Sequence, residues 1–164
     1  MTHVASFVVR QLHSAYAAAW PQIVADVQQI IDACANLGIV IAGPDGTGDP
    51  QVDLTAGIVF NGDADTDANR TPLRLPPPLP SDGLWPTGTA VHFQVDTDGG
   101  AYDIAVRVTL LRLLHHAGDA FALADNNDGI DPWAEAILMH SRLFGGLSDR
   151  VRSLLYYATH ATAA

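Results

Sequence analysis

The chain has 164 residues, of which 48% are hydrophobic and only 16% are charged, and its formal net charge is −10. This length fits one domain, and so apolar a composition can build a core, which excludes a largely disordered chain. With eight Arg and no Lys, the chain has no basic stripe to displace counterions, which excludes nucleic acid and anionic membrane surfaces as partners.

The N-terminal quarter is predicted to be helical. Apolar residues in 3–19 recur at helical spacing, Pro21 interrupts the pattern, and it resumes from Ile23 to Leu37. Because Pro fits the first turn of a helix but kinks its interior, two helices or one kinked helix are both consistent with the pattern, ending at Gly38. Cys34, the only cysteine, falls in this apolar stripe, so we expect a buried, inert thiol.

Three short apolar runs then predict strands, over 39–42, 54–61 and 89–95. A long loop, 62–88, separates the second from the third and is rich first in Asp and then in Pro. Its segment 74–80 (RLPPPLP), here called the strap, should lie stiffly across the domain. We expect four apolar side chains to anchor this part of the loop: Leu73, Leu75, Leu79 and Trp85.

The C-terminal half predicts alternating elements. A helix over 101–117 is apolar nearly all round, which indicates a central position, and a strand over 120–124 follows it. Asp131 and Pro132 have the pattern of a helix start, and Ser148 is the expected cap of a last helix.

These elements predict one α+β domain spanning 1–164. The strands 89–95 and 120–124, joined by the helix 101–117, form a βαβ crossover with parallel strands if both join one sheet. The earlier strands are close enough for a hairpin, so we expect a mixed sheet of about four strands. The N-terminal helices and two C-terminal helices should pack on this sheet.

The acidic residues mark one edge of the predicted sheet. All eighteen except Glu135 are Asp, a residue that collects at turns and helix caps. If the two later strands are parallel, Asp96 and Asp98 leave the sheet on the same side as Asp125 and Asp128. Gathered carboxylates suit Mg²⁺ or Ca²⁺, so these four residues are candidate metal ligands. The alternative is that they only shape turns and caps.

The run from Phe93 to Gly100 (FQVDTDGG) resembles the first motif of the haloacid dehalogenase-like phosphohydrolases. The resemblance implies that Asp96 is a nucleophile and Asp98 a general acid/base, with Mg²⁺ holding the phosphoryl group. It covers only these eight residues, and the Lys that the family needs downstream is missing.

The histidines assemble into no recognisable catalytic set. His92, Gln94 and Asp96 alternate with apolar residues along one strand, which predicts a polar face turned away from the core. His140 is expected to point to solvent or to satisfy one hydrogen bond.

The leading hypothesis is therefore a non-catalytic protein-interaction domain that uses no cofactor. Its partner is expected to be a second copy of itself, in a homo-oligomer formed through the segments 3–19 and 147–160. One alternative is a divalent-cation-dependent phosphohydrolase acting at Asp96 and Asp98. Another is an acidic inhibitor or immunity-type protein that blocks a basic partner.

The expected location is the cytoplasm. No apolar run approaches the roughly 20 residues of a membrane span, and no basic stretch precedes an apolar one at the N-terminus.

Overall fold

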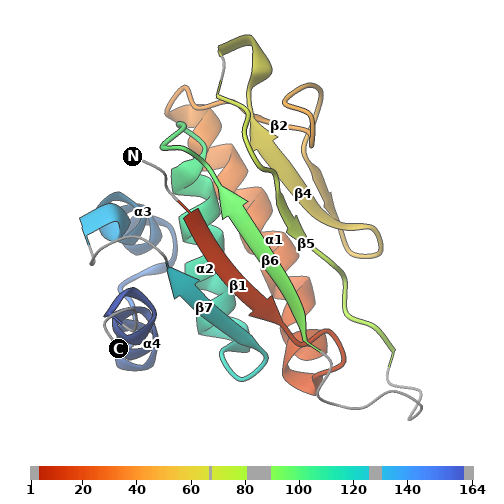
Figure 1. Cartoon of the computed structure of the whole chain (residues 1–164), viewed down its shortest axis with the longest axis vertical. Helices are drawn as coiled ribbons and strands as arrows, with labels where there is room; N and C mark the ends of the chain where they lie inside the picture. The colour runs from red at the N-terminus through yellow and green to blue at the C-terminus, as the bar shows by residue number, and fades with distance from the viewer. Residues whose placement is uncertain (1–3, 67, 81–89, 126–130, 161–164) are drawn as a thin grey trace.

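The computed structural model describes residues 4–66, 68–80, 90–125 and 131–160, and it confirms the α+β class. In Figure 1 the helices α1 and α2 run side by side behind a three-stranded sheet, with a second sheet next to it. In chain order the elements are β1 (Val4–Val9), α1 (Ser14–Asn36), β2 (Ile41–Ala42), β3 (Gln51–Asp53), β4 (Gly57–Gly62), β5 (Leu73–Leu75), β6 (Val91–Asp96), α2 (Asp103–Ala117), β7 (Phe121–Asp125), α3 (Ala134–Phe144) and α4 (Asp149–His160), with 3₁₀ turns at Ala64–Thr66 and Asp131–Trp133.

The prediction of a helix over 3–19 is wrong in its first half, because Val4–Val9 forms strand β1. Its side chains alternate, with Ala5, Phe7 and Val9 buried and the residues between them only half-buried. β1 is the central strand of its sheet, paired antiparallel with β6 on one side and β7 on the other. The N-terminal segment therefore forms part of the core.

The expected single mixed sheet is replaced by two sheets, and every neighbouring pair of described strands is antiparallel. One sheet has the order β6-β1-β7, and β4 in the other pairs with β2, β3 and β5. Because β6 and β7 both run opposite to β1, they run parallel to each other, as the βαβ pattern predicts. They are not neighbours, since β1 lies between them.

Helix α1 is one continuous helix of 23 residues that contains Pro21. It begins where the side chain of His13 accepts a hydrogen bond from the amide of Ala15, at 3.0 Å. Gly38 follows its end with φ +74°, a left-handed conformation that glycine adopts without strain. The buried stripe includes Cys34, as predicted, and burial raises the pKa of this thiol to about 11.

The expected long loop over 62–88 contains a strand, β5, whose Leu73 and Leu75 are buried against β4. The strap then crosses the start of α1, where the Tyr16 hydroxyl donates to the Pro76 carbonyl at 2.6 Å and Gln11 Nε2 donates to the Pro77 carbonyl at 2.7 Å. Leu79 does not anchor the strap, because half of its surface is exposed. Trp85 lies outside the described residues.

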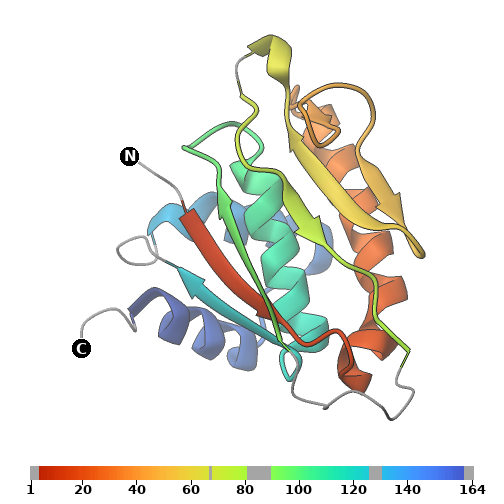
Figure 2. The same ribbon diagram turned by 45° about the vertical axis from the view of Figure 1, so that its right-hand side comes forward.

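Helix α2 is central, as predicted, with eleven of its residues buried. In Figures 1 and 2, α1 lies along one side of α2, and α3 and α4 lie on the other. Ser148 accepts a hydrogen bond from the Val151 amide at 3.2 Å, which confirms its capping role for α4. None of the helices in the described ranges has the length and apolarity needed for a membrane crossing.

Candidate functional site

The acidic ends of β6 and β7 lie at the same end of the three-stranded sheet, as predicted for parallel strands, and this end is here called the acidic edge. Asp96, the last residue of β6, is opposite Val4, and Asp125, the last residue of β7, is opposite Ala5. The start of β1 lies between them, so two strand spacings, roughly 10 Å in total, separate the two backbones. Asp128 and the side chain of Asp125 lie outside the described residues.

The described side chains at this edge are engaged in local contacts. Asp96 accepts a hydrogen bond from the Asp98 amide at 3.0 Å, which closes a turn. Asp98 has φ +47° and lies 3.6 Å from the Nε of Arg70. Among the described residues, no group of three His, Cys, Asp or Glu side chains could hold a metal ion. A cation held jointly by Asp96, Asp98, Asp125 and Asp128 therefore stays a prediction.

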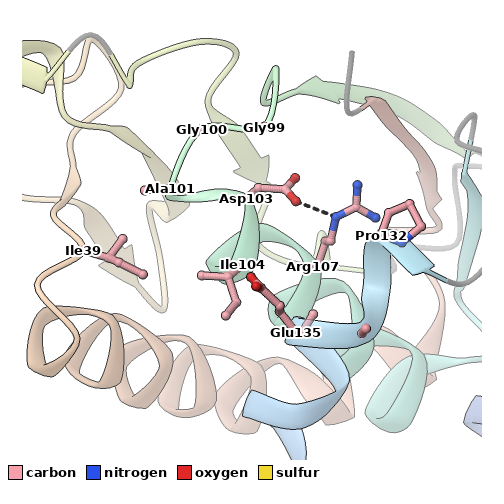
Figure 3. A pocket seen from close by; sticks show the side chains of 11 residues that line it. Ile39, Gly99, Gly100, Ala101, Asp103, Ile104, Arg107, Pro132 and Glu135 are labelled. Atoms are coloured by element: carbon pink, nitrogen blue, oxygen red, sulfur yellow. Dashed lines mark hydrogen bonds and ion pairs between the residues drawn. The ribbon is translucent and has the colours of Figure 1, made fainter. Parts of the chain in front are cut away.

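A cavity of about 690 Å³ lies beside this edge, between the loop that leads into α2 and the start of α3 (Figure 3). Arg107 lies in its wall, buried, with its Nε 2.7 Å from the Asp103 carboxylate. The guanidinium also lies over the ring of Trp133, 4.8 Å from the ring centroid. Since Asp103 offsets this positive charge and Glu135 adds a negative one, the cavity is not a preformed anion site.

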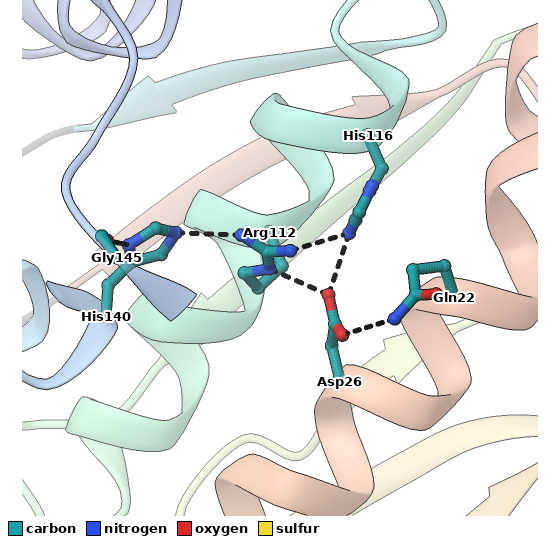
Figure 4. Close-up of polar contacts among 6 residues, drawn as sticks. All are labelled: Gln22, Asp26, Arg112, His116, His140 and Gly145. Carbon is teal, nitrogen blue, oxygen red and sulfur yellow. Dashed lines mark hydrogen bonds and ion pairs between the residues drawn. The ribbon is translucent and has the colours of Figure 1, made fainter. Parts of the chain in front are cut away.

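An extended buried polar arrangement joins α1, α2 and α3 (Figure 4). Asp26 accepts hydrogen bonds from Arg112 Nε at 2.7 Å and from Gln22 Nε2 at 2.8 Å. Arg112 in turn contacts the Nε2 atoms of His116 and His140, at 2.8 and 3.2 Å. We call Asp26, Arg112, His116 and His140 the buried cluster.

The partners of His140 identify its tautomer. Its Nδ1 lies 3.0 Å from the Gly145 carbonyl, which can only accept, so Nδ1 carries the proton. Nε2 is then free to accept from Arg112. Burial first, and then the charge of Arg112, lower the pKa of His140, which favours this neutral form. Of the two predicted alternatives for His140, a position in solvent is wrong, because only 2% of its surface is exposed, and its ring instead forms hydrogen bonds within the protein.

His116 differs from His140, because one of its ring nitrogens, Nε2, lies close to both a donor and an acceptor. Its Nε2 lies 2.8 Å from Arg112 Nη2, which only donates, and 2.8 Å from Asp26 Oδ2, which only accepts. The nitrogen can satisfy one of these neighbours at a time. Burial would raise the pKa of Asp26, but the hydrogen bonds from Gln22, Arg112 and His116 and the Arg112 charge hold it below its ordinary value.

Sequence reasoning missed the buried cluster, although α1 and α2 each carry a signal for it. Asp26 interrupts the apolar stripe of α1 next to Val27, and Arg112 lies in a helix that is apolar nearly all round. A charged residue on a buried helix face needs an opposite charge nearby, so each residue implies a partner. The cluster links side chains of α1, α2 and α3 within the core.

An apolar groove of about 370 Å³ lies between the end of α1 and the side of α3. Its lining is Ala33, Leu37, Ile104, Leu138, Met139 and Leu143, with Asn36, Glu135 and Arg142 as the polar members. Leu37 is 60% exposed and Leu138 is 53% exposed. Large apolar side chains that are exposed to solvent around a groove are typical of protein interaction sites.

The groove differs from the predicted interaction surfaces. Segment 3–19 is excluded as an apolar helical surface, because its first half is the central strand β1. Segment 147–160 contains α4 and buries Val151 and Leu155, while Tyr156 and Tyr157 are exposed. The groove lining has one acid and one base, whereas the chain as a whole carries a net charge of −10.

The chain matches no protein-family model, no curated protein and no solved structure, so its function has to be inferred from its own geometry.

Proposed function

We propose that this protein is a non-catalytic interaction domain that associates with a second copy of itself through the groove between α1 and α3. The observation that carries the proposal is the group of exposed leucines at this groove. Leu37 and Leu138 expose more than half of their surfaces beside an apolar cavity, which leaves a large hydrophobic area in water unless a partner covers it.

Charge favours a second copy at this groove over any other face. Arg107 and Arg112 are buried and paired with Asp103 and Asp26, so the net charge of −10 is carried by the rest of the protein. Two copies repel each other wherever acidic surfaces meet. The groove, with Glu135 and Arg142 as its only charged lining residues, is locally neutral, so two copies repel each other less there than where acidic surfaces meet.

The test compares two leucines that are equally exposed, each at 53%. Leu138→Asp places a charge in the groove and should weaken self-association at least tenfold, about 1.4 kcal/mol. Leu54→Asp makes the same change in the β3–β4 turn, away from the groove, and should leave the association unchanged. Light scattering over a concentration series measures both. Equal effects of the two substitutions would remove the groove from the proposal.

A further inference from the structure

The exposed face of α3 carries a short charge pattern that a single copy leaves unused. Glu135, Leu138 and Arg142 are spaced by three and four residues, which places them on one face of the helix, and all three are exposed. Within the described part of the chain, neither Glu135 nor Arg142 forms an ion pair. Glu135 is also the only glutamate of the protein.

This pattern is self-complementary under a two-fold rotation. Consider a two-fold axis that is perpendicular to α3 and runs beside it, at the level between Leu138 and Met139, and that relates α3 to an antiparallel α3 of a second copy. Positions 135 and 142 lie equally far from this axis, so Glu135 of each copy faces Arg142 of the other. Leu138 lies next to the axis, where it meets the apolar groove of the opposite copy.

We propose that the protein forms an isologous dimer in which α3 packs antiparallel against α3 of the second copy, with a Glu135–Arg142 ion pair at each end and Leu138 at the centre. This inference rests on the proposed self-association and specifies its geometry. The apolar contact supplies most of the affinity, because ion pairs at the rim of an interface contribute little. The two ion pairs select the antiparallel register, since a parallel arrangement would place Glu135 opposite Glu135.

A charge exchange tests the register. Glu135→Arg and Arg142→Glu each create two like-charged contacts, so each should weaken dimerisation by about tenfold at low salt. The double variant restores both pairs in reversed order and should bind within about threefold of the wild type. Sedimentation equilibrium measures the dissociation constants, and the exposed Arg152→Glu on α4 is the control for charge alone.

The two single variants also separate local pairing from net charge. Glu135→Arg makes the acidic protein less negative and Arg142→Glu makes it more negative. Overall repulsion would therefore move the two dissociation constants in opposite directions, whereas facing pairs weaken both dimers. If the wild type dimerises and the double variant dimerises as weakly as the single variants, the antiparallel pairing is overturned, but self-association is not. A monomeric wild type would instead reject the proposed function.

A cysteine at position 138 tests the same axis by a second route. Cys34 is buried, so Leu138→Cys supplies the accessible thiol, and diamide takes up the two hydrogens when two such thiols join. A covalent dimer should form readily in Leu138→Cys, because the two copies of residue 138 meet at the axis. Leu54→Cys, which places the thiol at an equally exposed position, should form little covalent dimer. Equal cross-linking at the two positions, or none at 138, would contradict the proposed axis.

Discussion

Asp26 and Arg112 are 86 residues apart in the chain, yet their side chains meet at 2.7 Å in the interior. A buried ion pair of this kind contributes little net stability when intact, but removing one partner leaves a desolvated charge behind. The spacing of residues within one helix is readable from the sequence. Which helix packs on which is set by the whole fold, so the sequence indicates that Asp26 needs a partner without identifying it.

Substitution of Asp26 should therefore be costly. Asp26→Asn keeps the shape of the side chain but removes the charge that neutralises Arg112, and it should lower the free energy of unfolding by about 3–5 kcal/mol. Asp32→Asn is the matched control on α1, because Asp32 is exposed and accepts one hydrogen bond, from Gln28. Its effect should stay within about 0.5 kcal/mol. Urea denaturation measures the free energy of unfolding of both variants. A loss in Asp26→Asn as small as that in Asp32→Asn would contradict a buried charge pair.

His115 on α2 and His140 on α3 should make the fold less stable in acid. Burial is the first cause that lowers the pKa of both His115 and His140 below the ordinary 6.5. The unfolded chain then binds protons that the folded chain does not, so stability decreases as the pH falls below about 6.5. The lowered pKa of Asp26 adds a further loss below about pH 4.

The melting temperature of the wild type should accordingly drop between neutral pH and about pH 5.5. His140→Gln keeps an acceptor and a donor on one side chain without a titrating group, so its melting temperature should change less over this interval. Thermal unfolding followed by circular dichroism gives both curves. Parallel curves for the two proteins would show that His140 does not contribute to the acid sensitivity.

Some residues behave as their type predicts. Asp53 accepts hydrogen bonds from the Ala56 amide at 2.7 Å and from the Thr55 hydroxyl at 2.7 Å, and Asp45 accepts from the hydroxyl and amide of Thr47. These bonds lower the pKa of each carboxyl. The expectation that Asp shapes turns is confirmed at these two residues. It could be made from the sequence because each contact joins residues only two or three positions apart in the chain.

At the scale of elements, α2, β6, β7 and the two C-terminal helices were predictable because Gly, Pro, Asp and Ser mark their ends. β1 was not. Its residues Val4, Phe7 and Val8 fit a helical stripe, but the buried set is Ala5, Phe7 and Val9. A short apolar run fits both the helical and the strand spacing of apolar residues. A central strand with apolar residues on both faces also lacks the alternation of apolar and polar residues that distinguishes a strand from a helix.

The two neighbours Phe7 and Val8 test the strand against the helix. Phe7 stacks on Phe93 with ring centroids 5.2 Å apart and also packs against Phe121 at 5.6 Å. Phe7→Ala should cost about 3–5 kcal/mol, whereas Val8→Ala, on the opposite face of β1, should cost less than about 1 kcal/mol. A helix would bury both residues on one stripe, so comparable losses in urea denaturation would contradict the strand.

At the scale of the whole molecule, the low charge content indicated an uncovered apolar surface but could not locate it. The groove is built from the end of α1, the start of α2 and the side of α3, segments that come together only in the folded chain. Self-association stays a prediction, and the α+β class is confirmed. The composition thus predicted an exposed apolar surface, and the packing of three helices forms the groove at which Leu37 and Leu138 are exposed.

Sedimentation equilibrium of the unmodified protein is the most direct test of the central claim, that this is a self-associating interaction domain. We expect a mass that rises from that of one chain to that of two as the concentration increases from micromolar to millimolar. Added NaCl should strengthen the association, because it screens the repulsion between two chains of net charge −10. A mass of 17.4 kDa at every concentration and salt level would contradict the claim.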